Sequence, residues 1–276
     1  MIAFRDITVP EADKMKILVT GARGFVGSRI MDALSDAVPS PSLQGMDEDA
    51  VRRMVDEAEI DFIIHTAAIS DIGECEKHPD ASRHANIDLP LYLTKTGVPI
   101  CLFSTDQVYS GCTGEGPYAE EEVCPANTYA AHKLEMEQRV LEENPDAVLL
   151  RATWMYDMPR YGTVNRGNFL MNMLRMEEVA FSSTQHRAVT YVREVADMME
   201  KAMQLPGGVY NFGSENDLTI LETAQWLRET LSLPVKLKDA GPRHPLWMDC
   251  SRAKRNGVCF LTTIEGLKKC IADYSL

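Results

Sequence analysis

A short apolar segment that runs into a glycine turn constrains the fold of this chain most strongly. Residues 16–20 are mostly aliphatic or β-branched, and glycines follow at positions 21, 24 and 27. Residues 25–34 place apolar side chains on one helical face, so the segment predicts a strand, a tight turn and a helix. Glycine is needed where a turn is tight and where the backbone approaches a pyrophosphate. The pattern predicts a dinucleotide-binding turn, although any strand-to-helix turn could use such glycines.

Three further apolar segments repeat the same alternation along the first half of the chain. They span residues 62–68, 99–105 and 147–151, and each follows a predicted helix, at 49–58, 87–96 and 126–143. Strands that are apolar throughout and alternate with amphipathic helices are typical of a parallel sheet covered on both faces. The sequence therefore predicts an α/β fold with a doubly wound, Rossmann-type parallel sheet. The second strand is the weakest element, because residues 36–43 contain two prolines and leave room for a very short strand.

The domain organisation follows from where this alternation ends. Residues 15–150 are predicted to form the dinucleotide-binding Rossmann domain, with a later return of the chain near residues 179–212. Residues 151–276 have a looser pattern and are predicted to form mainly a smaller, C-terminal substrate-binding lobe. Residues 1–14 precede Met15 and the first strand, and we interpret them as an extension.

Charge and cysteine spacing exclude several classes of function. The net charge is −13, and residues 1–150 have 12 Lys and Arg against 27 Asp and Glu. An acidic chain lacks the cationic face that nucleic acids or anionic membranes need, so we expect neither partner. No apolar run is long enough to span a membrane, and the seven cysteines lack the paired spacing of a metal site. We therefore expect no metal, and a cytoplasmic protein with reduced thiols.

Tyr129 and Lys133 form a second motif, because residues four apart on a helix lie on the same face. This pair alone is common on protein surfaces. A functional interpretation of the pair is favoured by Ser104, Thr105 and Asp106. These residues end an apolar strand, and parallel sheets bind ligands at the ends of such strands. A Lys cation lowers the pKa of a neighbouring Tyr and makes its hydroxyl a usable proton donor. A hydroxyl from Thr105 could hold a carbonyl oxygen beside that Tyr.

Together these motifs resemble the extended short-chain dehydrogenase/reductases, and within them the dTDP-4-dehydrorhamnose reductase branch. The resemblance implies an NAD(P)H-dependent reductase of a keto-sugar nucleotide, in which hydride passes to a ketone and Tyr129 supplies the proton. The most specific matches are Phe103-Ser104-Thr105-Asp106 with Val108-Tyr109 and Gly111, and Arg151-Ala152-Thr153-Trp154-Met155-Tyr156. The other matches are Gly21 to Gly27, His65-Thr66-Ala67-Ala68, Cys75-Glu76 and Tyr129 to Lys133.

The resemblance also implies a role for individual residues. The catalytic set is Thr105, Tyr129 and Lys133. The cofactor-binding set adds Gly21, Arg23, Gly24, Phe25, Val26, Ala67, Ala68, Ile69 and Ser104. The substrate-binding set is Ser70, Asp106, Trp154 and Arg243. NADP(H) is favoured over NAD(H), because residues 38–42 contain no carboxylate for the ribose hydroxyl and Arg23 could pair with a 2′-phosphate. NAD(H) stays open.

Two departures from the family pattern concern the substrate. The family usually has Tyr where this chain has Gln107. Its Asp-Gln-x-Gly-x-Pro-Thr stretch reads here Thr184-Gln185-His186-Arg187-Ala188-Val189-Thr190. The loss of that Gly and Pro changes the backbone near the expected substrate pocket. The redox residues are intact, but a rhamnose precursor as substrate does not follow from the sequence.

Two other functions remain open on the same residues. One is a nucleotide-sugar epimerase or dehydratase with tightly held NAD. The other is a non-catalytic, nucleotide-binding regulatory subunit, since the β subunit of methionine adenosyltransferase resembles the same reductase branch. The sequence also leaves open whether the chain forms a homodimer.

Overall fold

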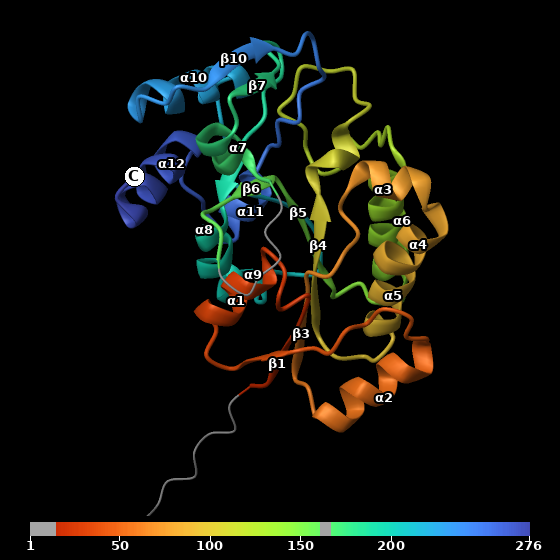
Figure 1. Ribbon diagram of the computed structural model, residues 1–276. Helices are drawn as coiled ribbons and strands as arrows, with labels where there is room; N and C mark the ends of the chain where they lie inside the picture. The colour runs from red at the N-terminus through yellow and green to blue at the C-terminus, as the bar shows by residue number, and fades with distance from the viewer. Residues whose placement is uncertain (1–14, 161–166) are drawn as a thin grey trace, which may run out of the picture.

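A parallel sheet of six strands forms the centre of the molecule (Figure 1). The structure is a computed structural model that describes residues 15–160 and 167–276. The strand order is β2-β1-β3-β4-β5-β9, and every neighbouring pair is parallel. The strands are β1 (Ile17–Thr20), β2 (Ala37–Pro39), β3 (Phe62–His65), β4 (Ile100–Thr105), β5 (Val148–Ala152) and β9 (Gly208–Phe212). The predicted α/β, Rossmann-type fold is confirmed.

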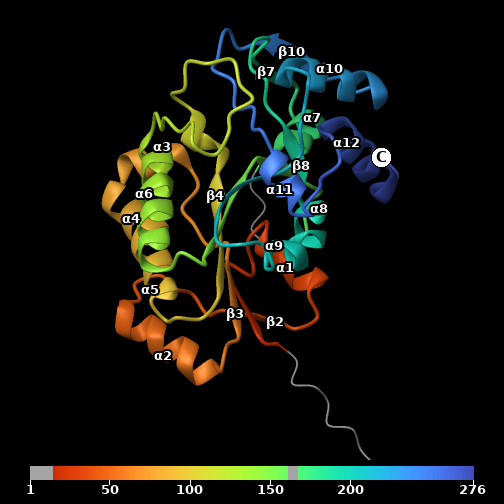
Figure 2. The same ribbon diagram turned by 180° about the vertical axis from the view of Figure 1, so that it is seen from behind.

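Helices cover both faces of this sheet, as the two opposite views show (Figures 1 and 2). One layer comprises α1 (Gly27–Ala33), α8 (Val192–Asp197), α9 (Met199–Ala202) and α11 (Ser251–Arg255). The other comprises α2 (Glu48–Ala58), α3 (Ile72–Lys77), α4 (Pro79–Arg83), α5 (Leu89–Thr94) and α6 (Thr128–Glu143). A π-helical turn, His84–Asp88, joins α4 to α5, and a 3-10 turn, Asp106–Tyr109, follows β4.

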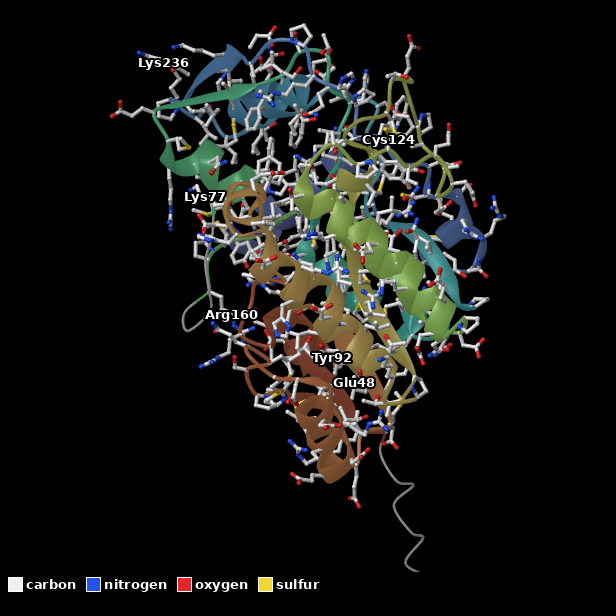
Figure 3. All side chains as sticks on the ribbon, turned by 90° about the vertical axis from the view of Figure 1, so that its right-hand side faces the viewer. Glu48, Lys77, Tyr92, Cys124, Arg160 and Lys236 are labelled. Atoms are coloured by element: carbon white, nitrogen blue, oxygen red, sulfur yellow. The ribbon has the colours of Figure 1, made fainter. Side chains whose placement is uncertain are left out.

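Successive side chains along each strand point to opposite faces of the sheet, so the core consists of one apolar cluster under each helix layer. Ile17 and Val19 pack in the cluster that includes Ile30 of α1, whereas Leu18 packs in the opposite cluster with Val51 of α2. Both faces of β1 are therefore buried, which explains why the strand is apolar at every position. The second layer is seen face-on in Figure 3, where Glu48 is labelled on α2; its carboxylate lies 2.7 Å from Lys95 Nζ, just after α5.

A smaller lobe lies beyond the carboxyl ends of the strands (Figure 1). It contains α7 (Phe169–Arg175), α10 (Ile220–Thr230) and α12 (Thr263–Tyr274). Two pairs of parallel strands complete it, β6 (Trp154–Tyr156) with β8 (Val189–Tyr191), and β7 (Glu178–Phe181) with β10 (Lys236–Asp239). These elements enclose an apolar cluster of their own, which includes Phe169, Tyr191 and Leu227.

The later part of the chain divides between the sheet and the lobe. Within the segment near 179–212 that we expect to return to the Rossmann domain, β9 pairs with β5 in the main sheet. In contrast, β7 pairs with β10 in the lobe. The weak second strand forms with only three residues, Ala37–Pro39, at the edge of the sheet next to β1. Residues 1–14, which we interpret as an extension, lie outside the described residues.

Candidate active site

The glycine turn packs so closely that its first and last glycines have no room for a side chain. Gly21 has a φ of +67°, and a Cβ there would lie 2.9 Å from Thr66 Oγ1. A Cβ on Gly27 would lie 2.3 Å from the carbonyl oxygen of Gly21. Gly24 N–H donates to the same carbonyl, at 2.7 Å. The turn thus lies directly against the end of β3 and leaves its outer side open, as the approach of a pyrophosphate requires.

This turn forms one wall of a cavity of about 960 Å³ at the carboxyl ends of β1, β3, β4 and β5. That volume is at the upper end of the range of ligand sites in proteins. The cavity collects residues that are separated by as many as 166 positions in the sequence, from Gly21 to Arg187. Thirteen of the residues predicted for the site line it: Gly21, Gly24, Phe25, Val26, Ala67, Ala68, Ser70, Ser104, Thr105, Asp106, Tyr129, Lys133 and Trp154.

The predicted catalytic residues Thr105, Tyr129 and Lys133 all line the cavity. Tyr129 and Lys133 lie in α6, whose start is capped by Asn127, and their side chains are 8% and 2% exposed. The Lys133 ammonium donates to the carbonyl of Phe103, 2.8 Å away in β4. Thr105 ends the same strand. The helix and the strand therefore bring one phenol, one ammonium and one hydroxyl together at the end of the sheet.

Burial and neighbouring charges set the ionisation of the two titratable groups. Desolvation is the main cause that lowers the pKa of Lys133, from 10.5 to about 8, and the Glu137 carboxylate opposes this shift. Burial raises the pKa of Tyr129, opposite to the lowering expected from a neighbouring Lys, and a hydrogen bond with Thr105 offsets only part of this rise. The phenol is therefore protonated near neutral pH and can act as a proton donor.

A buried ion pair lies behind Lys133. Glu137, one helical turn further along α6, accepts hydrogen bonds from Ser104 Oγ and from the Arg151 guanidinium. Arg151 also donates to the Tyr109 hydroxyl, at 2.8 Å. This network joins α6 to β4 and β5 and fixes the backbone that carries the predicted catalytic residues. Glu137 and Arg151 are not among the residues predicted for the site.

An ion pair that the sequence did not predict lies beside Trp154, in the part of the cavity predicted to bind the substrate. The Arg187 guanidinium lies 2.9 Å from the Asp106 carboxylate, and its carbon lies 5.3 Å from the centre of the Trp154 ring. Gln107 Nε2 donates to the same carboxylate, at 3.3 Å. Gln107 and Arg187 are two of the positions at which the chain departs from the family pattern. That departure is the only sequence signal of their role.

Trp154 has two sets of neighbours. Its ring lines the cavity and also lies 6.1 Å from the ring of Phe169 and 6.5 Å from that of Phe181, in the core of the lobe. One face of a rigid indole is thus held by packing while part of its surface remains available in the cavity.

Three of the predicted site residues do not line this cavity. Arg23 is exposed on the glycine turn, and Arg243 is exposed and joined through its backbone to Thr184. The backbone carbonyl of Ile69 accepts from Cys75 Sγ and Asn86 Nδ2, which are structural contacts. The cavity is also lined by residues outside the predicted site set, namely Thr66, Asp71, Ile72, Phe103, Ala152, Thr153, Met155, Gly167 and Asn168.

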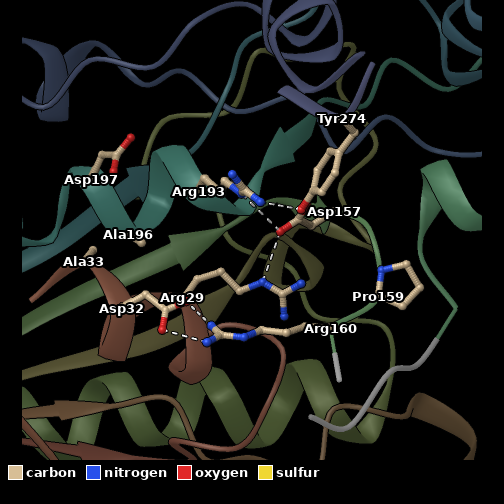
Figure 4. A pocket seen from close by; sticks show the side chains of 10 residues that line it. All are labelled: Arg29, Asp32, Ala33, Asp157, Pro159, Arg160, Arg193, Ala196, Asp197 and Tyr274. Atoms are coloured by element: carbon tan, nitrogen blue, oxygen red, sulfur yellow. Dashed lines mark hydrogen bonds and ion pairs between the residues drawn. The ribbon is translucent and has the colours of Figure 1, made fainter. Parts of the chain in front are cut away.

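A second cavity, of about 620 Å³, lies where α1 meets the lobe (Figure 4). It is lined by charged side chains that pair with one another. Arg29 and Arg193 are directed at Asp157, at 3.1 and 3.8 Å, and the Tyr274 hydroxyl donates to the same carboxylate, at 2.6 Å. Since these charges are compensated within the protein, we interpret this cavity as a structural junction.

Neither a metal site nor a membrane span is found in the described part of the chain. No group of three or more His, Cys, Asp or Glu residues within 15–160 and 167–276 could hold a metal ion. No helix in these ranges combines the length and the apolar character that crossing a bilayer requires.

The parallel sheet, the glycine turn and the Thr–Tyr–Lys arrangement define a member of the extended short-chain dehydrogenase/reductase superfamily. The chain belongs to the family described as the RmlD substrate binding domain, whose model matches residues 15–243. This confirms the family predicted from the motifs.

Individual relatives differ in their described activities. A dTDP-4-dehydrorhamnose reductase of Burkholderia thailandensis is 34% identical over 199 residues, which cover 66% of this chain and 64% of that protein, less than two thirds of its length. Methionine adenosyltransferase 2 subunit beta of Bos taurus is 28% identical over 88% of this chain and 83% of its own. The crystal structure of dTDP-4-dehydrorhamnose reductase from Bacillus anthracis in complex with NADP has a TM-score of 0.81 at 23% identity, covering 94% and 99% of the two chains.

Proposed function

We propose that this protein is an NAD(P)H-dependent reductase that reduces the ketone of a keto-sugar nucleotide. The observation that supports this most directly is the meeting of Thr105, Tyr129 and Lys133 in a cavity one wall of which is the glycine turn. The similarity to dTDP-4-dehydrorhamnose reductases supports the same reaction class.

The cavity fits a dinucleotide at the glycine turn. Gly21 and Gly24 line the cavity, and no side chain fits at Gly21 because a Cβ there would lie 2.9 Å from Thr66 Oγ1. When bound, the reduced nicotinamide supplies the hydride that the ketone carbon accepts. Ser40 and Ser42 follow β2 where NAD enzymes place a carboxylate, and the exposed Arg23 lies on the glycine turn; both favour NADP(H) over NAD(H).

The protein's own residues handle the proton. Tyr129 holds its proton near neutral pH and donates it to the carbonyl oxygen as that oxygen gains negative charge. Lys133, held by the Phe103 carbonyl, provides a positive charge that stabilises the resulting phenolate. The Thr105 hydroxyl binds the carbonyl oxygen beside Tyr129 and orients it. The balanced reaction converts ketone, reduced cofactor and one proton to alcohol and oxidised cofactor.

The test is cofactor oxidation with a panel of nucleoside-diphosphate keto-sugars. The wild type is expected to oxidise NADPH with at least one of them, and Tyr129→Phe is expected to lower kcat about a hundredfold or more, because general acid catalysis contributes that much. Tyr92→Phe, which removes a hydroxyl from α5 away from the cavity, is the matched control. An unchanged rate in Tyr129→Phe would refute the assignment of the proton donor.

A regulatory subunit is the second candidate, favoured by the similarity to methionine adenosyltransferase 2 subunit beta over most of both chains. Such a protein would bind the nucleotide and a partner protein without turnover. Binding of NADPH together with inertness toward every keto-sugar of the panel would favour this candidate over the reductase.

A further inference from the structure

Gln107 and Arg187 meet on one carboxylate in the part of the cavity predicted to bind the substrate. Gln107 Nε2 donates to Asp106 Oδ1 at 3.3 Å, and Arg187 Nε and Nη2 donate to Asp106 Oδ2 at 3.1 and 2.9 Å. These residues come from a turn after β4 and from a segment 80 positions later in the lobe. Thr105 Oγ1 also donates to Asp106 Oδ1, at 3.4 Å. Asp106 is 2% exposed, so its two oxygens are committed to donors of the protein.

The same contacts leave one donor and one acceptor unused. Among the described residues, none forms a hydrogen bond with Nη1 of Arg187 or with Oε1 of Gln107. The Arg187 side chain is 18% exposed, and both residues line the cavity. Because Nε2 must face the carboxylate to donate, the amide oxygen of Gln107 is the atom left for a ligand.

Both side chains are held in place before any ligand binds. Arg187 is fixed by the two-point contact with Asp106 and by the Trp154 ring beneath it. A planar guanidinium held in this way loses little conformational entropy when it forms one more hydrogen bond. The positions of the donor and the acceptor are thus set by the protein rather than by the ligand.

We propose that Gln107 and Arg187 form a recognition site for a hydroxyl group of the sugar, close to the reacting carbonyl. This inference rests on the proposed function, because it names the substrate class of the same site. A hydroxyl accepts from Arg187 Nη1 and donates to Gln107 Oε1, so it satisfies both atoms at once. The substrate is therefore a keto-sugar that is hydroxylated at this point.

Two other ligand groups fit the site less well. A methyl or methylene group leaves both polar atoms unpaired in the closed complex, which costs affinity. A carboxylate or phosphate gains the Arg187 contact, but its oxygens face the amide oxygen of Gln107 and the Asp106 carboxylate, which already neutralises the guanidinium. The site should therefore bind a sugar with a hydroxyl at this point more tightly than one with an apolar or an anionic group there.

The experiment measures equilibrium binding, so it does not depend on turnover. The probes are UDP-glucose, dTDP-glucose, their analogues that each lack one hexose hydroxyl, UDP-glucuronic acid and the nucleoside diphosphates alone, all at saturating NADP⁺. We expect one deoxy analogue to bind the wild type about tenfold more weakly than its parent, the loss of one well-made hydrogen bond. Arg187→Ala and Gln107→Ala should remove this difference and leave nucleoside diphosphate binding unchanged. Arg187→Lys should restore it only in part, since the lysine lacks the planar fork.

The controls are Arg175→Ala and Gln225→Ala, which remove the same groups from exposed positions outside the cavity. The inference is overturned if no deoxy analogue binds more weakly than its parent or if the wild type binds no sugar nucleotide. The inference would also be overturned if Arg187→Ala bound every probe more weakly by the same factor, the nucleoside diphosphates included. Arg187 would then contact the phosphates. Tighter binding of UDP-glucuronic acid than of UDP-glucose would overturn the inference as well. Hydroxyl-dependent binding without any keto-sugar reduction would refute the proposed reductase and leave this inference standing.

Discussion

Glu137 and Arg151 form an ion pair in the protein interior, with 2.6 Å between Oε2 and Nη2 and side chains 2% and 3% exposed. The pair joins α6 to β5 one helical turn from Lys133. A buried carboxylate without its partner keeps the desolvation penalty and loses the attraction that offsets it. Removal of either charge alone should therefore destabilise the protein.

Arg151→Met is expected to lower the free energy of unfolding by about 3–5 kcal/mol, because it leaves the Glu137 carboxylate unpaired in the interior. The double variant Arg151→Met/Glu137→Met should lose less than the single variant, since it removes both charges. Urea unfolding of the two variants and the wild type measures this. A single variant within 1 kcal/mol of the wild type would contradict the structural role of the pair.

Lys133 should make stability depend on pH in the alkaline range. Its pKa is lowered from 10.5 to about 8, so between these values the unfolded chain binds more protons than the folded one. The free energy of unfolding therefore rises with pH in this window, by on the order of 1 to 2 kcal/mol up to about pH 9.5. The difference in stability between wild type and Lys133→Met, without cofactor, should follow this rise. A difference independent of pH would exclude a lowered pKa.

His65 should make the free energy of unfolding depend on pH in the acid range. Its pKa is lowered from 6.5 to about 3 by burial and by the Lys133 charge, and Thr20 Oγ1 lies 2.8 Å from its Nδ1. The unfolded chain takes up this proton first as the pH falls below 6.5, so the fold loses stability toward pH 3.

His65→Gln should lower this acid sensitivity by on the order of 2 kcal/mol at about pH 4.5 relative to pH 7.5, even if the variant is less stable at neutral pH. Thermal unfolding at the two pH values gives the comparison. The exposed His244→Gln is the control and should match the wild type. The same acid sensitivity in His65→Gln as in the wild type would show that other groups cause it.

Gly27→Ala should weaken both the fold and cofactor binding. The added Cβ would lie 2.3 Å from the Gly21 carbonyl oxygen, a backbone atom, so the glycine turn must move. We expect a lower melting temperature and a smaller thermal shift with NADPH than in the wild type. Gly73→Ala, at an exposed position in α3 where the added Cβ meets only Asp71 Oδ1 at 3.3 Å, is the matched control. If NADPH raised the melting temperature of Gly27→Ala as much as that of the wild type, the glycine turn would not be part of the cofactor site.

Local patterns predicted the sheet and the helices, because each depends on residues close together in the chain. The glycine turn, the buried strands and the spacing of Tyr129 and Lys133 all carry their signal within a few residues. Even the short β2 could be placed, since Pro39 does not prevent an edge strand of three residues.

The remaining parts of the site depend on contacts between distant segments. The ion pair of Asp106 with Arg187 spans 81 positions, and nothing near either residue specifies the other. Arg243 illustrates the opposite case, because a residue predicted to bind the substrate lies exposed outside the cavity. Pattern gives the type of residue at a site, whereas the packing of the lobe decides which side chain reaches it.

The junction at Asp157 has a consequence for how the chain folds during its synthesis. This one carboxylate accepts from Arg29 in α1 and from Tyr274 at the end of α12. The two partners are 128 and 117 positions away from it, so the contacts are among the least local in the molecule. Such contacts close late and slow folding. A ribosome-bound chain from which α12 has not yet emerged cannot complete this junction, so the main sheet is fully joined to the lobe only after α12 has been synthesised.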